Sequence, residues 1–465
     1  MMWPWSKPQP TVRVVPMRVR GRYDAAQTTA ENRRHWANAD ALDARSANSL
    51  AVRKALRERS RYEIANNTYA KGMVLTLAND IVGTGPRLQL LSGNEELNAR
   101  LEDEWANWTI VRDLADKLRT MVMARVGDGE GFGKLIDNPR QGLLASLDVQ
   151  LIEADQVTED SLASGWPDHT DGIRYDANGN PISYTILDEH PGSSLGSISK
   201  GRSVPARDVV HLFRADRPGQ LRGIPEITPA LPLFAQLRRY TLAVIQAAEA
   251  AADFAVIMKT NMPPGEAAEM DGQWLEMEMQ RGQMVFAPEG WDPAQMKAEQ
   301  PTTSYADFKH EILNEIARCL NMPYNIAAGN SSGYNYSSGR LDHQTYYRSI
   351  RIGQNQLERV VMDRLFSAWL LEVSLHLDLP ATPLRHHWFW DGQEHVDPAK
   401  EANAQATRLK SHTTTLATEY AKQGKDWEEE LKQRGKEKAL MDQLGLTDAD
   451  AHPLQDRDEE DEGDE

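Results

Sequence analysis

The sequence has almost no cysteine: Cys319 is the single one among 465 residues. One cysteine excludes an internal disulfide and any zinc or iron–sulfur site built from several cysteines. Long apolar runs are also missing, because the best candidate, Leu242 to Met258, has about 17 residues and contains Glu249 and Asp253, whereas a bilayer needs about 20 apolar residues. The start, Met1 to Trp5, lacks the charged and apolar regions of a signal peptide. These absences predict a cytoplasmic protein, or one assembled there.

Basic residues are too few to balance the acidic ones. The chain has 52 lysines and arginines against 69 aspartates and glutamates, a formal net charge of −17. This balance argues against a protein whose main role is to hold phosphates over a broad surface. The hydrophobic content of 40% and the charged content of 26% are typical of a globular chain. A length of 465 residues allows roughly two to four domains.

The charge is distributed unevenly along the chain. Residues 1–62 contain thirteen basic and five acidic residues, a net charge of +8, and residues 1–22 are rich in proline and arginine. Residues 448–465 contain ten carboxylates against Arg457 alone, a net charge of −9. Charged blocks at chain ends are typical of solvated tails. The alternative is that the basic arm and the acidic tail are contact surfaces for partners.

The glycine-rich run from Gly127 to Lys134 invites a test for nucleotide binding. A phosphate-binding loop would need glycine at position 128 and serine or threonine at position 135, where Asp128 and Leu135 stand. A dinucleotide fingerprint would need glycine at position 132 or 134, where Phe132 and Lys134 stand. Both motifs fail, so this run predicts a tight turn between a helix and a strand.

Other candidates for chemistry are weak. His386 and His387 are adjacent, so in a strand their side chains point to opposite faces and cannot share a metal. Asp128 and Glu130 are two residues apart and could share one face of a strand, but such a pair is more typical of a loop or a surface than of catalysis. Neither a Gly-x-Ser-x-Gly elbow nor a His-Glu-x-x-His helix occurs. The sequence predicts a protein that is not an enzyme and that has no metal and no cofactor.

Helical patterns dominate the chain, and short strands with intervening turn signals fill residues 131–225. The predicted fold class is therefore α+β, mainly α. Further expected elements are helices over Ile64–Ile81, Glu95–Trp108, Arg112–Val126, Leu233–Met258, Ser304–Leu320 and Arg340–Leu377, strands over Arg87–Leu91 and Trp388–Trp390, and a charged helical segment over 398–444.

The predicted helix over Leu233–Met258 is unusual in composition. Seven of the fifteen residues from Thr241 to Ala255 are alanine, which allows helices to approach closely. The apolar side of the helix is thin, so it needs neighbouring helices, either from its own chain or from identical copies. Its polar side is a stripe that recurs every seven residues and has a glutamate beside it: Arg239, Gln246, Asp253 and Glu249.

The segment from Asn330 to Gly339 has ten residues and no aliphatic side chain. Asparagine, serine and glycine favour turns and irregular backbone. This composition predicts a flexible loop between two helical regions.

Several segments, in order, resemble the portal proteins of tailed phages, specifically the lambda-type family. No single motif decides the matter, but together they cover most of the chain from about residue 23 to residue 445, in a fairly specific order and spacing. The chain departs from the family pattern at Gly131 and Gly339, where the family has alanine. The matching segments are Tyr23–Ala26, Arg57–Gly85, Gly129–Phe132, Gly223–Pro225, Asn335–Ser338 with Arg340, and Val396–Glu401.

The resemblance implies a ring at one capsid vertex, typically of twelve subunits, through which double-stranded DNA enters and leaves. It also implies an assignment of regions along the chain: an N-terminal arm at 1–22, a wing at 23–225, a stem helix at 226–260, a clip at 261–302, a second stem helix at 303–320, a tunnel loop at 321–340, a wing helix and strand at 341–397, a crown at 398–447 and an acidic tail at 448–465.

The same resemblance implies roles for particular residues. The stem stripe described above would belong to the stem, and Trp274 and Trp291 would belong to the clip interface. The residues expected to face the DNA channel are Asn330, Ser331, Ser332, Tyr334, Asn335, Tyr336, Ser337, Ser338 and Arg340.

The implied partners are identical copies, DNA in the channel, the large terminase subunit, the head–tail adaptor and the major capsid protein, with no membrane. The implied location is the virion, after assembly in the host cytoplasm. Two alternatives remain: an enzyme of the packaging machine, which would need the phosphate-binding loop that is missing, and a virion scaffold or adaptor that conducts no DNA.

Overall fold

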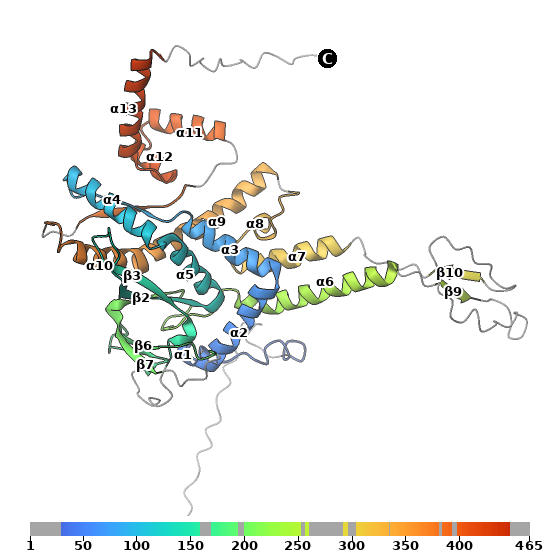
Figure 1. Cartoon of the computed structure of the whole chain (residues 1–465). Helices are drawn as coiled ribbons and strands as arrows, with labels where there is room; N and C mark the ends of the chain where they lie inside the picture. Colours follow the sequence, from blue (N-terminus) through green and yellow to red (C-terminus); the bar gives the residue numbers. More distant parts are fainter. Residues whose placement is uncertain are drawn as a thin grey trace, which may run out of the picture.

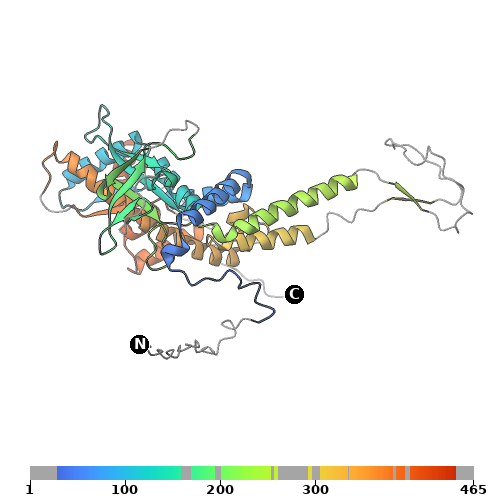
Figure 2. The ribbon, with the colours of Figure 1, turned by 90° about the horizontal axis from the view of Figure 1, so that it is seen from below.

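The computed structural model describes residues 29–158, 169–193, 200–252, 256–259, 292–295, 304–333, 335–380, 384–392 and 398–446. It confirms the predicted class, α+β and mainly α. A body of helices and small sheets carries a long two-helix projection on one side and a separate group of C-terminal helices on another (Figure 1). The turned view shows the projection standing clear of the body along most of its length (Figure 2).

The N-terminal helices of the body are α1 (Ala44–Ala47), α2 (Leu50–Asn66) and α3 (Thr68–Val82). The prediction of one helix over Ile64–Ile81 is wrong in its start, because Asn67 has extended backbone and caps α3 through its side chain, which accepts hydrogen bonds from the next turn. The expected pair that follows is confirmed as α4 (Glu95–Val111) and α5 (Leu114–Asp128).

The body contains three sheets. Strand β2 (Glu130–Asp137) is central in the first, between β3 (Leu147–Ile152) and β8 (Val209–Phe213). The predicted tight turn is confirmed, because α5 ends at Asp128 and β2 starts two residues later. The second sheet pairs β1 (Arg87–Leu90) with β11 (His386–Phe389), and the third orders β4 (His169–Thr170), β5 (Ile173–Tyr175), β6 (Pro181–Leu187) and β7 (Gly201–Pro205). Short 3₁₀ turns occur at Ala154–Gln156, Ala206–Asp208 and Thr228–Ala230.

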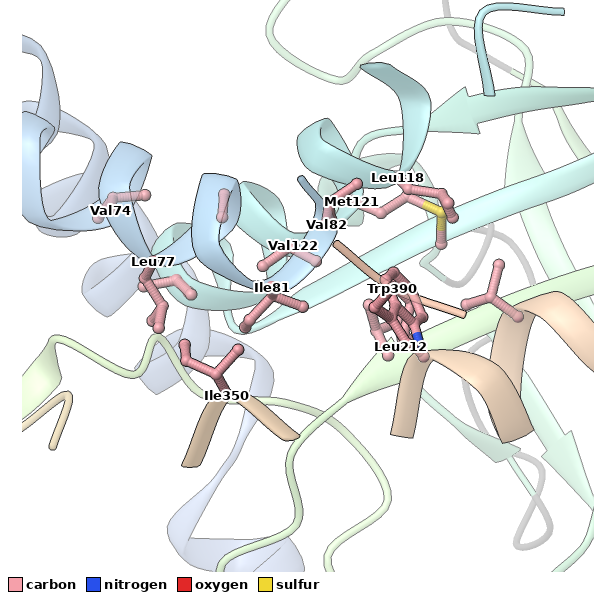
Figure 3. Packing of buried hydrophobic residues seen from close by; sticks show 14 of the residues in the cluster. Val74, Leu77, Ile81, Val82, Leu118, Met121, Val122, Leu212, Ile350 and Trp390 are labelled. Carbon is pink, nitrogen blue, oxygen red and sulfur yellow. The ribbon is translucent and has the colours of Figure 1, made fainter. Parts of the chain in front are cut away.

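One large hydrophobic core joins segments that are far apart in sequence. Figure 3 shows Leu77 and Ile81 of α3 pointing toward Ile350 of a later helix, with α5 side chains close behind. Trp105 is fully buried, stacks on Trp108 at 4.8 Å between ring centroids and meets further aromatic rings edge-on. Aromatic pairs of this kind add about 0.5–1.5 kcal/mol beyond their burial, so this core fixes the helices of the body firmly.

A later helix of the body, α9 (Tyr336–Leu357), continues through a π-helical turn (Glu358–Met362) into α10 (Asp363–Val373). The prediction of a helix over Arg340–Leu377 is therefore right in type, but α9 starts four residues earlier and α10 ends four residues earlier. One row of α9 faces the core against α3, and Gly353 in that row lets Ile81 approach closely.

The projection consists of α6 (Leu231–Ala252) and α7 (Ser304–Arg318), which lie side by side (Figures 1 and 2). The prediction that α6 reaches Met258 is wrong: Val256–Lys259 forms β9, which pairs antiparallel with β10 (Asp292–Gln295). Branched side chains at 256 and 257 favour extended backbone. A short helix, α8 (Tyr324–Ala328), follows α7. Within the described ranges, no helix has the length and apolar composition that a bilayer crossing requires.

The C-terminal helices are α11 (Pro398–Lys410), α12 (Leu416–Lys422) and α13 (Trp427–Leu444), which confirms the predicted charged helical segment. They contact the body through a narrow seam. Gly424, in left-handed conformation, lies so close to the Trp390 carbonyl that a Cβ atom would be 2.4 Å from that oxygen, and Gly392 packs equally closely on Gln423. Beside this seam the Gln89 amide donates to Asp426 over 2.7 Å.

A half-buried carboxyl group, Glu102 of α4, lies beside this seam. Burial raises the pKa of Glu102 to about 7, and the carboxylates of Asp426 and Glu429 on α13 act in the same direction. Because the folded chain holds this proton more tightly than the unfolded chain, the stabilisation is complete below the usual pKa of a glutamate and is lost as the pH rises toward 7. We expect hydrogen exchange in α12 and α13 to speed up between about pH 5 and pH 8.

The Glu102→Gln variant should remove most of this pH dependence, whereas Glu96→Gln, on the exposed face of the same helix, should keep it. Equal pH dependence in all three proteins, after correction for intrinsic exchange, would show that Glu102 does not control the seam.

Candidate functional site

A buried ionic cluster lies at the base of the projection, centred on Glu130 at the start of β2. The Glu130 side chain is fully buried, as are Arg57 and Arg222, whose exposed fractions are 3% and 2%. Its carboxylate accepts hydrogen bonds from Arg222 at 2.5 and 2.8 Å and from Arg57 at 3.1 Å. The Gly223 backbone N–H donates to it over 3.1 Å. One carboxylate thus joins α2, β2 and the loop that leads into α6.

Arginines of α2 enter the cluster in a row. Arg53, Arg57 and Arg61 are spaced by four residues, which places them on one face of the helix. Arg61 donates two hydrogen bonds to Asp128 at 2.7 and 2.8 Å, and Arg53 pairs with Asp171. The interpretation of residues 1–62 as a solvated basic block is therefore wrong for Arg53, Arg57 and Arg61, whose charges are neutralised within the chain.

The charge state of the cluster follows from burial and contacts. Burial acts to raise the pKa of Glu130, but Arg222 and His211 outweigh it and hold that pKa well below its usual range. Burial lowers the pKa of His211, whose Nε2 lies 3.2 Å from the Glu130 carboxylate. The prediction of a loop or surface role for Glu130 is wrong, because this carboxylate is an ionised, fully paired group of the interior.

Close backbone contact places the loop before α6. A Cβ atom on Gly223 would lie 1.9 Å from the Gly129 carbonyl oxygen, so no other residue fits there without displacement. Three residues later, Glu226 pairs with Arg125 of α5 at 2.9 Å and with Arg214 at 2.6 Å, and its carbonyl accepts a hydrogen bond from the Cys319 thiol. The start of α6 and the end of α7 are thereby held by the same few residues.

The two helices of the projection pack on each other through aromatic side chains. The Tyr240 ring lies 4.8 Å from Phe308 and 5.7 Å from Tyr305. Leu242 and Ile245 of α6 remain about half exposed, at 51% and 47%. The sequence left open whether α6 is covered by its own chain or by identical copies; α7 covers one side, and an apolar strip on α6 stays uncovered.

The predicted stripe on α6 is exposed to solvent over its described residues, Arg239, Gln246 and Glu249. Asp253 lies outside the described residues, as do Trp274 and Trp291 of the predicted clip interface and the whole of the arm and of the tail. Their expected roles therefore stay predictions.

The predicted tunnel loop is shorter than expected. Helix α8 lies within 321–340 and α9 starts at Tyr336, so Tyr336, Ser337, Ser338 and Arg340 belong to a helix. Among the described residues of this range, irregular backbone remains at 321–323, 329–333 and 335. Asn330 donates its N–H to the Asn325 carbonyl at 3.0 Å and accepts from the Ser332 N–H at 2.9 Å. Polar side chains stabilise this turn, and Ser331, Ser332 and Asn335 are exposed, while Tyr334 is outside the described residues.

The remaining candidates for metal binding do not form a site. His386 and His387 are half-buried and exposed respectively, as expected for opposite faces of β11, and His386 approaches Asp363 at 3.2 Å. Sequence patterns missed a cluster of Glu153, Asp155 and His190, in which the two carboxylates are two residues apart and the histidine comes from a later segment. Arg61 already lies 3.2 Å from Glu153 and 2.7 Å from Asp155, so an arginine neutralises this acidic group.

Comparison with known proteins yields one consistent result. A family model described as "Phage portal protein, lambda family" matches residues 31–354. A "Probable portal protein" of Halomonas phage phiHAP-1 is 22% identical over 429 residues, which cover 84% of this chain and 82% of that protein.

The matches to solved structures are more distant. The neck of an empty gene transfer agent particle contains a chain that is 13% identical, with a TM-score of 0.48 and coverage of 75% of this chain and 87% of that chain. An HK97 family phage portal protein from Corynebacterium diphtheriae is 11% identical, with a TM-score of 0.30 and coverage of 74% and 97%.

Loss of a carboxylate in the buried cluster should lower the free energy of unfolding far more than loss of an exposed carboxylate. Glu130→Gln removes the counter-charge of the buried Arg222 and one of the two carboxylate partners of Arg57, which keeps Asp155. We expect the free energy of unfolding to fall by about 3–5 kcal/mol. Asp188→Asn breaks an exposed pair with Arg202, and we expect a change below about 1 kcal/mol. Urea unfolding of the three proteins measures both values. Similar losses in the two variants would contradict the role given to Glu130.

Proposed function

The chain belongs to the lambda family of phage portal proteins, and from this premise we propose that it forms a closed ring that conducts double-stranded DNA into and out of a capsid. In this proposal the body is the wing, α6 and α7 are the stem, residues 261–302 are the clip, and α11 to α13 are the crown. The ring has twelve copies and lies at one vertex of the virion, after assembly in the host cytoplasm.

The observation that carries the proposal is the uncovered apolar strip on α6. A projecting helix pair that leaves Leu242 and Ile245 half exposed in the single chain has reason to associate with further helices. Head-to-tail contacts between identical stems close into a ring when the rotation between copies divides a full turn. The small alanine side chains of α6 suit close approach at such a contact.

The polar segment 329–335 supports a channel lining. Its exposed serine and asparagine side chains offer a sliding duplex no apolar surface and no fixed positive charge. Phosphate affinity depends strongly on neutralising cations, so a lining of this kind keeps friction on DNA low. The overall net charge of −17 per copy acts in the same direction.

The proposed partners follow from a position at a vertex. The clip meets the large terminase subunit during packaging and the head–tail adaptor afterwards, while the wing contacts the major capsid protein. The proposal includes no enzymatic activity for this chain, because the glycine-rich run at 127–134 forms a structural turn next to the buried cluster.

Assembly tests the role of the strip on α6. Leu242→Asp places a charge where the proposal has helices in contact, so we expect rings to be lost in native mass spectrometry and negative-stain images, with subunit affinity reduced by a factor of about 10 or more. Ile110→Asp, at a side chain that is 75% exposed on the body, is the matched control and should assemble normally. A wild-type chain that stays monomeric, or a ring without an axial opening of about 20 Å for a duplex, would favour a scaffold or adaptor role.

Cross-linking tests the channel directly. We expect Ser332→Cys, carrying a photoactivatable probe, to cross-link to DNA in packaged particles because 329–335 lines the channel in this proposal. Glu95→Cys, at an exposed position of the body, is the control. Cross-links to DNA from position 95 at a yield equal to that from position 332 would contradict a channel position for this segment.

A further inference from the structure

A row of exposed arginines runs along the outer face of α9. Residues 340, 344, 348, 351 and 355 lie within about 80° of arc at 3.6 residues per turn, and position 359 follows one turn later. All six side chains are exposed. The row is about 28 Å long at 1.5 Å per residue. We call it the α9 arginine row. It consists of four arginines and two uncharged polar residues: Arg340, Arg348, Arg351, Arg359, Gln344 and Asn355.

The row lies opposite the face of α9 that packs into the body. The core-facing positions are fully buried, and the Tyr346 hydroxyl in that set donates to Asp80 of α3 over 2.6 Å. Because that face holds α9 in place, its opposite face points away from α3. At its C-terminal end, Asn355 and Arg359 border a hollow that Glu358, Asp363 and residues 386–388 of β11 also line. The arginine row is therefore a fixed, rigid surface, since the helix beneath it cannot rotate; the core-facing residues are Tyr346, Ile350, Gly353 and Leu357.

Among the described residues, none of the four arginines in the row has an ion pair or a hydrogen bond. Helix α2 differs, because its arginines Arg53, Arg57 and Arg61 follow one another every four residues on one face and each has a carboxylate partner. Both α2 and α9 thus carry a row of arginines, but among the described residues only the arginines of α2 are paired with carboxylates. In a chain with a net charge of −17, four unpaired cations on one face form a distinct local attraction for an extended anion.

We propose that the acidic tail, residues 448–465, docks along the α9 arginine row of its own copy. The tail has ten carboxylates and a net charge of −9 over eighteen residues, which matches an extended cationic row better than a pocket. Its 19 residues after Leu446, where the described chain ends, reach up to roughly 65 Å when extended. Tethering gives the tail an effective concentration on the order of millimolar, which favours its own copy over free anions.

The consequence is a shielded surface that phosphates reach only when the tail leaves. A duplex and the tail offer the same chemistry to guanidinium groups, a line of anionic oxygens. The docked tail therefore acts as an internal competitor of DNA on this face. This inference concerns the single chain and stands apart from ring formation, so its test uses the purified full-length protein.

Zero-length carbodiimide cross-linking tests the contact. The conservative variants Arg348→Lys and Arg351→Lys keep the charge and supply an amine that can join to a tail carboxylate. Arg100→Lys, exposed on α4, is the matched control. We expect cross-links to residues 448–465 at least about 10-fold more often from positions 348 and 351 than from 100, within one chain, and lost at high salt.

A second measurement uses a short DNA duplex at about 50 mM salt. A full-length variant with the ten tail carboxylates changed to amides should bind the duplex about 10-fold more tightly than wild type. The gain should disappear when Arg348→Ala and Arg351→Ala are added. Tail cross-links that fall mainly on the basic N-terminal arm, cross-links between two copies, or unchanged duplex binding by the amide variant would each overturn the proposal.

Discussion

The burial of one ionised carboxylate constrains most of this structure. Glu130 is neutralised only when Arg57 of α2 and Arg222 of the loop before α6 are both in place. A charge in the interior without partners costs several kcal/mol, so the three segments have to assemble together. The direction in which α6 leaves the body therefore depends on an interaction at its base rather than on the contacts along its length.

Local patterns in the sequence correctly predicted those turns, strands and helices that depend on neighbouring residues. The turn after α5 and the strand that ends near Trp390 followed from spacing and composition alone, as did most helices. The break at Asn67 was missed because an asparagine cap within a helical pattern is a weak signal. Glu130 was misjudged because its partners lie 73 and 92 residues away, and no local pattern places them. The end of α6 was missed since strand pairing with 292–295 decides it.

Arginine rows have two different uses in this chain. In α2 the row faces inward, and each cation stabilises the fold through a fixed carboxylate. In α9 the arginines also share one face, with wider gaps between them, and that face points outward on a helix that the core holds rigid. Helical periodicity in a sequence cannot distinguish the two cases, because it fixes which residues share a face and not where that face points. The net charge of the whole chain conceals both rows.

The seam between the C-terminal helices and the body is made largely by main-chain atoms. Gly392 and Gly424 meet their neighbours with no room for a side chain, while α13 has no buried residue at all. Apart from Asp426 and Glu429 near Glu102, substitutions over most of α13 therefore leave the seam intact. Any side chain at position 392 or 424 would instead push the C-terminal helices away from the body.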